Sequence, residues 1–192
     1  QTRSLGLGHA ILCARDVVGN APFAVLLASH LMLSRTSALQ QMFDHYRLYQ
    51  HDVIGVHPVA AHKTSCYTLV EGEHDEGGLL KVKRLFERPH PGDVPHRLAA
   101  VGRYVFSPQI FHHLAQIQPS LEGRYRLSDG IRSQIAERPV LAQHLQGRFF
   151  DCDDKLDYLA AMVEFGVNHE EVGPGFLGYL QGLCTDACAA PQ

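Results

Sequence analysis

Residues 23–28 read FAVLLA, and this run decides the fold class that the sequence predicts. Six consecutive apolar residues leave no polar face, which is typical of a strand that is buried on both faces of a helix-covered sheet. Apolar strand patterns alternate with helical patterns along the rest of the chain. We therefore predict an α/β fold, a mostly parallel sheet flanked by helices, with residues 23–28 as an interior strand.

The other helices and strands are predicted from the period of their hydrophobic residues, and their ends from Gly and Pro. The expected strands are 53–59, 66–70, 79–86, 98–106 and 140–145, of which 66–70 and 79–86 suit a local hairpin. The expected helices are 8–19, 36–50, 108–117, 128–137, 155–168 and about 175–184. Because no internal repeat or linker interrupts this pattern, residues 1–192 are expected to form a single domain.

Composition narrows the classes of function. Lys and Arg number 17 and Asp and Glu number 20, for a net charge of −3, so the basic excess of a nucleic-acid binder is missing. No apolar run reaches the ~18 residues that a membrane span needs. The 5 cysteines are scattered, with Cys184 and Cys188 one helical turn apart, and favour reduced thiols in the cytoplasm over a disulfide framework. The chain begins at Gln1 rather than Met, so we expect it to be part of a longer sequence.

Several polar groups stand at the ends of the expected elements. Gly6 and Gly8 precede a helix, and such an entry suits an anion or a flat ring as well as a plain turn. The cluster Asp151, Asp153 and Asp154 precedes another helix and would either bind Mg²⁺ or cap the helix. The 13 histidines have no zinc-site spacing and are expected to be scattered and mostly solvated.

Seven phrases carry a family resemblance, in family order over nearly the whole chain. They are QTRSLGLGHAILCA at 1–14, PFAVLLA at 22–28, ERP at 87–89, LAAVGRY at 98–104, SPQIF at 107–111, LSDGI at 127–131 and DCDDKLDY at 151–158. The sequence resembles bacterial UTP–glucose-1-phosphate uridylyltransferase, or UDP-glucose pyrophosphorylase, a nucleotidyltransferase. The resemblance implies an N-terminally truncated, Rossmann-like fold of the sugar-nucleotide transferase type. The chain would be a nucleotidyltransferase-like domain, the C-terminal two-thirds of the family fold.

The resemblance also implies a reaction and a set of site residues. UTP and glucose 1-phosphate would give UDP-glucose and pyrophosphate with Mg²⁺, in a cytoplasmic enzyme of carbohydrate metabolism. For the substrates, Gln1 and Gly6 would read and seat the uracil, Glu87 would accept hydrogen bonds from glucose hydroxyls, and Gly102 would let the sugar approach the backbone. As catalytic residues, Arg88 would hold the sugar phosphate and Lys155 would touch phosphate. Asp151 would be a Mg²⁺ ligand.

Some positions depart from the family pattern. The Gly-rich loop G-x-G-T-R, which cradles the UTP phosphates, is not in this sequence. Ser29 and His30 stand where the family has an Asp pair, and Ser is a poor Mg²⁺ ligand. The remaining departures are Thr68 for Gly, Arg124-Tyr125-Arg126 for E-I-Q, and Asp153 and Asp157 for Gly. Because the departures gather at the expected site, we expect catalysis by this chain to be impaired.

Three hypotheses stay open on the sequence alone. The chain is a uridylyltransferase that needs a further segment, a non-catalytic relative that binds sugar nucleotide or regulates an active paralogue, or an inactive fragment. Whether it is an enzyme is therefore undecided at this point. The resemblance suggests a homo-oligomer or pairing with an active paralogue, with no nucleic-acid or membrane partner.

Overall fold

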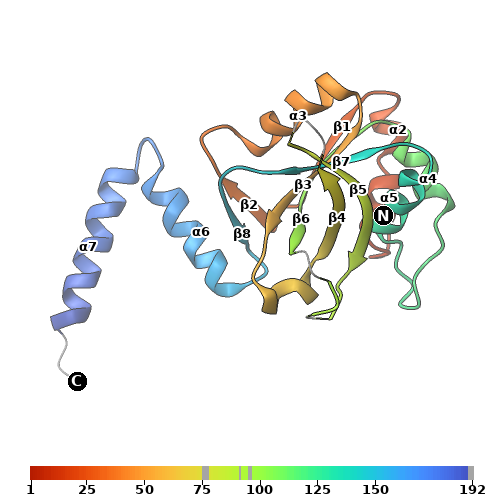
Figure 1. The fold of residues 1–192 in the computed structure, drawn as a ribbon. Helices are drawn as coiled ribbons and strands as arrows, with labels where there is room; N and C mark the ends of the chain where they lie inside the picture. Colours follow the sequence, from red (N-terminus) through yellow and green to blue (C-terminus); the bar gives the residue numbers. More distant parts are fainter. Residues whose placement is uncertain (75–77, 91, 95–96, 190–192) are drawn as a thin grey trace. The chain divides into compact units, whose positions relative to one another are not determined.

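The computed structural model describes residues 1–74, 78–90, 92–94 and 97–189, and only the backbone of 184 and 186–189. The chain divides into two compact units (Figure 1). The first consists of Gln1–Leu27 and Ser34–Gly147, and the second of Ala28–Leu33 and Arg148–Gln192. Each is described by itself, and the single domain over 1–192 stays a prediction. The side chains of Cys184 and Cys188 lie outside the described residues.

The first unit is built on a six-stranded sheet with the strand order β1-β6-β3-β7-β5-β4. The strands are β1 (Phe23–Leu26), β3 (Asp52–Pro58), β4 (Thr68–His74), β5 (Leu80–Glu87), β6 (Leu98–Phe106) and β7 (Val140–His144). The helices are α1 (Leu7–Leu12), α2 (Arg15–Val18), α3 (Ala38–Tyr49), α4 (Ile110–Gln116) and α5 (Leu127–Ile135), with a 3₁₀ turn at Ala61–Cys66. The α/β class with a central sheet flanked by helices is confirmed.

Strand direction differs from the prediction. Within the described residues β3–β7 is the one parallel pair, and the other pairs in this sheet are antiparallel. The expectation of a mostly parallel sheet is therefore wrong. A continuous apolar run predicts burial on both faces of a strand, and helix-covered parallel and antiparallel strands share that pattern, so the run does not determine strand direction. The hairpin of β4 and β5 is confirmed, since a short connection can join only antiparallel neighbours.

The position of residues 23–28 is a second correction. β1 pairs with β6 and has no second neighbour among the described residues, so it is an edge strand and not an interior one. Leu26 in this strand is 52% exposed. The apolar run indicates how much apolar surface the segment can bury. It does not indicate which strands lie on either side of the segment in the sheet.

The main core lies between the sheet and the layer of α1, α4 and α5. It joins strand residues such as Ile54 and Val56 to helix residues such as Ile110 and Ile131. Successive side chains on a strand point to opposite faces, so buried Val53 belongs to the other face, and α3 packs on β3 and β6. Both faces of the central strands are thus covered.

A buried carboxylate ties α5 to the sheet. Asp52 is fully buried at the start of β3 and accepts hydrogen bonds from the Ser107 backbone N–H at 2.8 Å and from the Gln134 amide at 2.7 Å. Hydrogen-bonded partners compensate a buried charge that would otherwise be very unfavourable. The pair of bonds holds α5 against the end of β6, and α5 in turn carries a residue of the site described below.

Helix boundaries follow local capping. The Ser37 side chain accepts a hydrogen bond from the Gln40 N–H, and α3 begins there as expected. The expected helix 8–19 is instead interrupted at Cys13 and Ala14, between α1 and α2.

Among the described residues, no helix combines the length and apolar character that crossing a bilayer requires.

The second unit consists of a two-stranded antiparallel sheet and two helices. β2 (His30–Leu33) pairs with β8 (Arg148–Asp151), and α6 (Lys155–Val167) and α7 (Gly173–Ala189) follow. The two short strands were not expected from the sequence, because their patterns are too brief to show a period. Both predicted helices are present, and α7 is longer than expected at each end.

Candidate functional site

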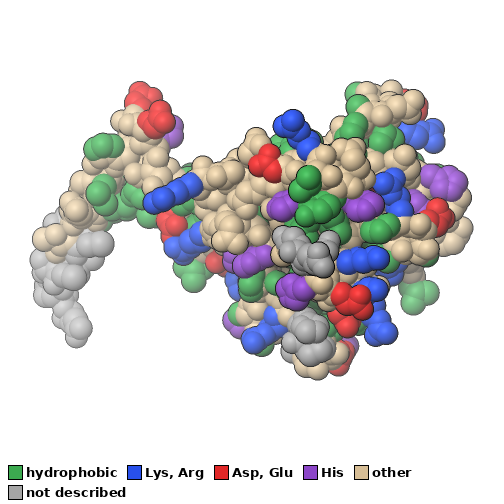
Figure 2. Space-filling model, turned by 45° about the horizontal axis from the view of Figure 1, so that its top comes forward, with side chains coloured by type: hydrophobic (Ala, Val, Ile, Leu, Met, Phe, Trp, Pro, Cys, Tyr) green, Lys and Arg blue, Asp and Glu red, His purple; other side chains and the backbone are tan. Residues whose placement is uncertain are grey.

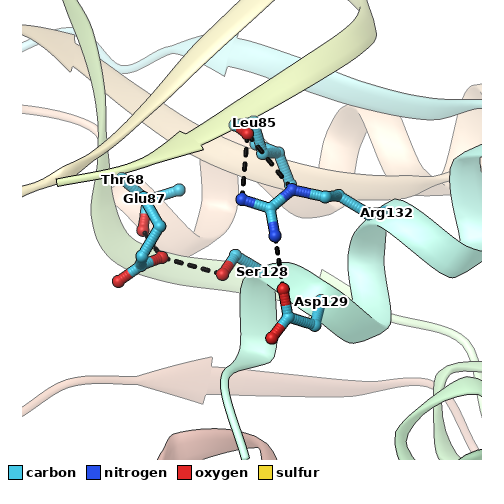
Figure 3. A network of polar contacts seen from close by, with 6 residues as sticks. All are labelled: Thr68, Leu85, Glu87, Ser128, Asp129 and Arg132. Atoms are coloured by element: carbon cyan, nitrogen blue, oxygen red, sulfur yellow. Dashed lines mark hydrogen bonds and ion pairs between the residues drawn. The ribbon is translucent and has the colours of Figure 1, made fainter. Parts of the chain in front are cut away.

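Glu87 ends β5 and accepts two hydrogen bonds from hydroxyl groups (Figure 3). Thr68, its cross-strand partner on β4, donates from Oγ1 to Oε2 of Glu87 at 2.8 Å. Ser128, in the first turn of α5, donates to the same oxygen at 2.7 Å. Both hydroxyls donate to one carboxylate oxygen and so fix the position of the Glu87 side chain. The structure thus presents one acidic acceptor where β4, β5 and α5 meet.

Arg132 anchors α5 beside this acid. Its guanidinium donates from Nε and Nη2 to the carbonyl oxygen of Leu85 at 3.2 and 3.0 Å, and Nη1 forms an ion pair with Asp129. Because Leu85 lies two residues before Glu87, this fork fixes the helix relative to the acid. Burial, and to a smaller extent the charge of Glu87, raises the pKa of the Tyr104 phenol, which therefore stays neutral.

The residues after Glu87 and within β6 have unusual backbones. Arg88 is exposed, and its φ is 45°, with its backbone N–H donating to the Tyr67 carbonyl at 3.1 Å. Gly102 has a φ of 63°, in a stretch of β6 where the register with β3 shifts. A glycine at such a bulge avoids the steric penalty of positive φ. The bulge is therefore a structural reason for this glycine, beside the approach of the sugar that the family resemblance implies.

Gly6 makes a close backbone contact with a loop residue. Its φ is 100°, and a Cβ added there would lie 2.6 Å from the Tyr125 carbonyl oxygen. The Gly8 backbone N–H donates to that oxygen at 3.0 Å. Gln1 lies beside them, with Nε2 3.0 Å from Nδ1 of His9 and 3.4 Å from the Gly6 carbonyl. The glycines are thus needed for packing on Tyr125, and the uracil role of Gln1 and Gly6 stays a prediction.

The loop and helix start at 125–128 connect the two groups of residues. Tyr125 touches the Gly6 end, and Ser128 bonds to Glu87. Sequence reasoning missed both hydroxyl partners of Glu87 and the Arg132 anchor. Thr68 had a signal, since it replaces glycine, but only the cross-strand register pairs its hydroxyl with Glu87. Asp151 and Lys155 belong to the second unit, so a single cleft that also contains them stays a prediction.

The second unit gathers His30, Asp151 and Asp153. His30 and Asp151 are strand partners on β2 and β8, both are about 9% exposed, and Nε2 lies 3.8 Å from Oδ1. The backbone N–H of Asp153 donates to the same Asp151 oxygen at 3.1 Å. One donor atom from each of the three residues lies within 4.8 Å of the others. Most histidines in the described part are exposed or half-buried, and Figure 2 shows many of them at the surface, whereas His30 and His113 are buried.

At the start of α6, one acid of the cluster caps the helix. Asp154 is the N-cap, and its side chain accepts from the backbone N–H groups of Leu156 and Asp157. Of the acidic cluster, Asp154 therefore follows the capping alternative. Burial first, and then Asp151, Asp153 and Asp157, raise the pKa of the neighbouring Cys152 thiol, which marks a locally negative potential. Lys155, the expected phosphate contact, is exposed in the first turn of α6.

Comparison with known proteins agrees with this architecture. The family model described as "Nucleotidyl transferase" matches residues 1–164. The chain is 36% identical over 183 residues to the UTP–glucose-1-phosphate uridylyltransferase YngB of Bacillus subtilis, covering 95% of this chain and 62% of that protein. It is 34% identical to a second B. subtilis UTP–glucose-1-phosphate uridylyltransferase, of which it covers 63%.

Solved structures show the same likeness. A UDP-glucose pyrophosphorylase complexed with UDP-glucose superimposes with a TM-score of 0.80 at 33% identity, over 85% of this chain and 63% of the other. The UDP-glucose pyrophosphorylase of Acinetobacter baumannii gives a TM-score of 0.82 at 34% identity, over 94% and 63%. The chain spans a little under two thirds of these relatives' length. On the match of residues 1–164, this chain belongs to the nucleotidyl transferase family.

Proposed function

We propose that the chain is a uridylyltransferase-type protein that binds UTP, glucose 1-phosphate or UDP-glucose, with catalysis impaired in this chain. The observation that supports it best is the Glu87 carboxylate, held by Thr68 and Ser128 where β4, β5 and α5 meet, in a chain with this family membership. The relatives named above are uridylyltransferases, and one structure was solved with UDP-glucose.

In the reaction, a phosphate oxygen of glucose 1-phosphate attacks the α-phosphorus of UTP, and the bond to the bridging oxygen breaks as pyrophosphate leaves. Glu87 accepts hydrogen bonds from sugar hydroxyls, and Gln1 and Gly6 bind the uracil. Gly102 lets the sugar approach the backbone, and Arg88 and Lys155 neutralise phosphate charge. Such a transfer needs little covalent help from the protein, so positioning and electrostatic stabilisation do most of the work.

A divalent cation belongs to this chemistry, and proteins of this family usually use one. The resemblance names Mg²⁺ with Asp151 as a ligand. Carboxylate oxygens of Asp151 and Asp153 suit Mg²⁺, but the imidazole of His30 beside them does not, because Mg²⁺ prefers an all-oxygen shell. The donor set does not fit Mg²⁺, and no step of the proposed reaction depends on it here.

Two features support impaired catalysis. The Thr68 side chain occupies the cross-strand position of Glu87, and its hydroxyl bonds to the acceptor that a sugar hydroxyl would use. Ser29 and His30 replace the expected acidic pair. Losing one preorganised electrostatic partner commonly lowers a rate by ~10²–10³, so we expect little turnover.

The second candidate is a sugar-nucleotide-binding or regulatory partner without catalysis. It is favoured because Glu87 is acidic, as in the family pattern, whereas Ser29 stands where the family pattern has Asp. A homo-oligomer or pairing with an active paralogue belongs to this candidate. A cytoplasmic location fits the free thiols of Cys13, Cys66 and Cys152.

Calorimetric titration of the full chain with UDP-glucose, together with pyrophosphate release from UTP and glucose 1-phosphate, tests the proposal. We expect saturable binding that is lost in Glu87→Gln, with little pyrophosphate release. Binding without turnover would favour the second candidate. No binding by a folded chain would refute both, and strong turnover by the unmodified chain would refute the impairment.

A further inference from the structure

The strand pair of the second unit holds an imidazole and a carboxylate face to face. His30 on β2 is in register with Asp151 on β8, and Nε2 and Oδ1 are 3.8 Å apart. Zn²⁺ lies ~2.0–2.2 Å from nitrogen and oxygen ligands, so two ligands of one tetrahedral ion are about 3.3–3.6 Å apart. The observed spacing of 3.8 Å is within a few tenths of an ångström of that range.

Asp153 supplies the third donor. It stands in the turn before α6, and its carboxylate lies within 4.8 Å of the other two donor atoms. Its side chain is exposed, so it has room to change rotamer, and coordination requires a rotamer that shortens this separation. The other acid of this turn, Asp154, is engaged as the helix cap. Three ligands leave a fourth position for water or a phosphate oxygen, as in zinc sites with an open position.

The donor types favour one class of ion. An imidazole nitrogen suits Zn²⁺ and other late divalent metals, whereas Mg²⁺ and Ca²⁺ prefer oxygen ligands alone. A neutral imidazole with two carboxylates has a net charge of −2, which matches a divalent cation. We propose that His30, Asp151 and Asp153 form a binding site for a divalent transition-metal ion such as Zn²⁺ or Co²⁺, in preference to Mg²⁺. The proposal concerns metal binding alone and holds whether or not the chain turns over UTP.

The test is a titration of the full chain with Co²⁺ alone, followed by the visible d–d absorption of the bound ion. We expect one Co²⁺ per chain, displaced by Zn²⁺ in stoichiometric amount and retained in a large excess of Mg²⁺. Even partners outside the ligand set change metal affinity by about 10–100-fold, so Asp153→Asn should weaken Co²⁺ binding at least that much. This exposed position is suited to substitution without loss of the fold.

His30→Asp tests the metal preference itself. It replaces nitrogen by oxygen, so we expect the preference for Co²⁺ over Mg²⁺ to fall by about 10-fold or more while a divalent site remains. Because His30 is buried, circular dichroism must show that this variant is folded, and Asp153→Asn decides the question if it is not.

Three matched variants should leave the Co²⁺ spectrum and affinity unchanged. Asp157→Asn removes an acid from the same helix start, His62→Asn removes an exposed imidazole, and Cys152→Ser removes the adjacent thiol. Equal Co²⁺ affinity in Asp153→Asn and the unmodified chain would overturn the proposal. Displacement of Co²⁺ by Mg²⁺ at similar concentrations would also overturn it, as would loss of the spectrum in Cys152→Ser.

Discussion

The two acids at strand ends, Glu87 of β5 and Asp151 of β8, have different neighbours. Glu87 receives hydroxyl groups of its own chain, Thr68 and Ser128, as neutral donors. Asp151 faces the imidazole of His30 and lies near a second carboxylate, that of Asp153, and these are the groups of the proposed metal site. Acids at the ends of two strands are thus suited to different ligands, Glu87 to a hydroxyl-bearing molecule and Asp151 to a metal ion. The difference comes from the side chains that the partner strand and the neighbouring helix or turn place beside each acid.

The largest expected effect comes from Gly6→Ala, a substitution in the first unit, which also contains Glu87. The positive φ and the contact with the Tyr125 carbonyl predict a loss of about 2–3 kcal/mol in the free energy of unfolding. Gly123→Ala has a positive φ but open space around it, and should lose only about 1–2 kcal/mol. Urea unfolding of both variants measures the difference. Equal losses would mean that the Tyr125 contact adds nothing.

The next prediction compares Arg132, in the first unit, with Arg148, in the second unit. Arg132→Met removes the fork on the Leu85 carbonyl, so this partly buried acceptor loses two donors and unfolding should become about 1–3 kcal/mol easier. Arg148→Met removes an exposed ion pair with Glu164, which should contribute at most about 1 kcal/mol. Urea midpoints at constant pH and salt test the order. A larger loss in Arg148→Met would contradict it.

A smaller effect is expected on ligand binding. Thr68→Gly removes both the hydroxyl and the bulk beside Glu87, and we expect UDP-glucose to bind about 10-fold tighter, or about 1.4 kcal/mol. Thr68→Val keeps the bulk and removes only the hydroxyl that occupies the Glu87 acceptor, so it should give only part of this gain. Calorimetry on both variants separates the two causes. An unchanged affinity in Thr68→Gly would show that Thr68 does not obstruct the sugar.

The smallest effect is a pH dependence from the buried imidazole of the first unit. Burial lowers the pKa of His113 below 6.5, so the unfolded chain takes up a proton more readily than the folded one. Stability is therefore full above pH 6.5, falls as the pH drops through that value, and levels off below the folded pKa. Urea unfolding between pH 7.5 and 5 should show a shallower decline in His113→Gln. An identical decline would assign the effect to other groups.

Local pattern was a good guide to which segments are helices and strands, and a poor guide to their neighbours. The β4–β5 hairpin follows from two short strands and a polar turn, all of which are close in sequence. FAVLLA is a strand as expected, but at an edge, and the sheet is mainly antiparallel. A segment's own residues determine its period and its apolar surface, whereas pairing and direction depend on segments far along the chain.

The sequence by itself determined the family, the α/β class and the candidate acids, because collinear motifs and hydrophobic period are properties of a linear chain. Only the tertiary structure decided which side chains meet those acids. Thr68 reaches Glu87 through strand register, and Ser128 reaches it because α5 is anchored by Arg132 and Asp52. His30 and Asp151 are 121 positions apart in the numbering and become partners on β2 and β8. Such meetings depend on geometry within a few ångströms, which residue types and spacing along a chain do not specify.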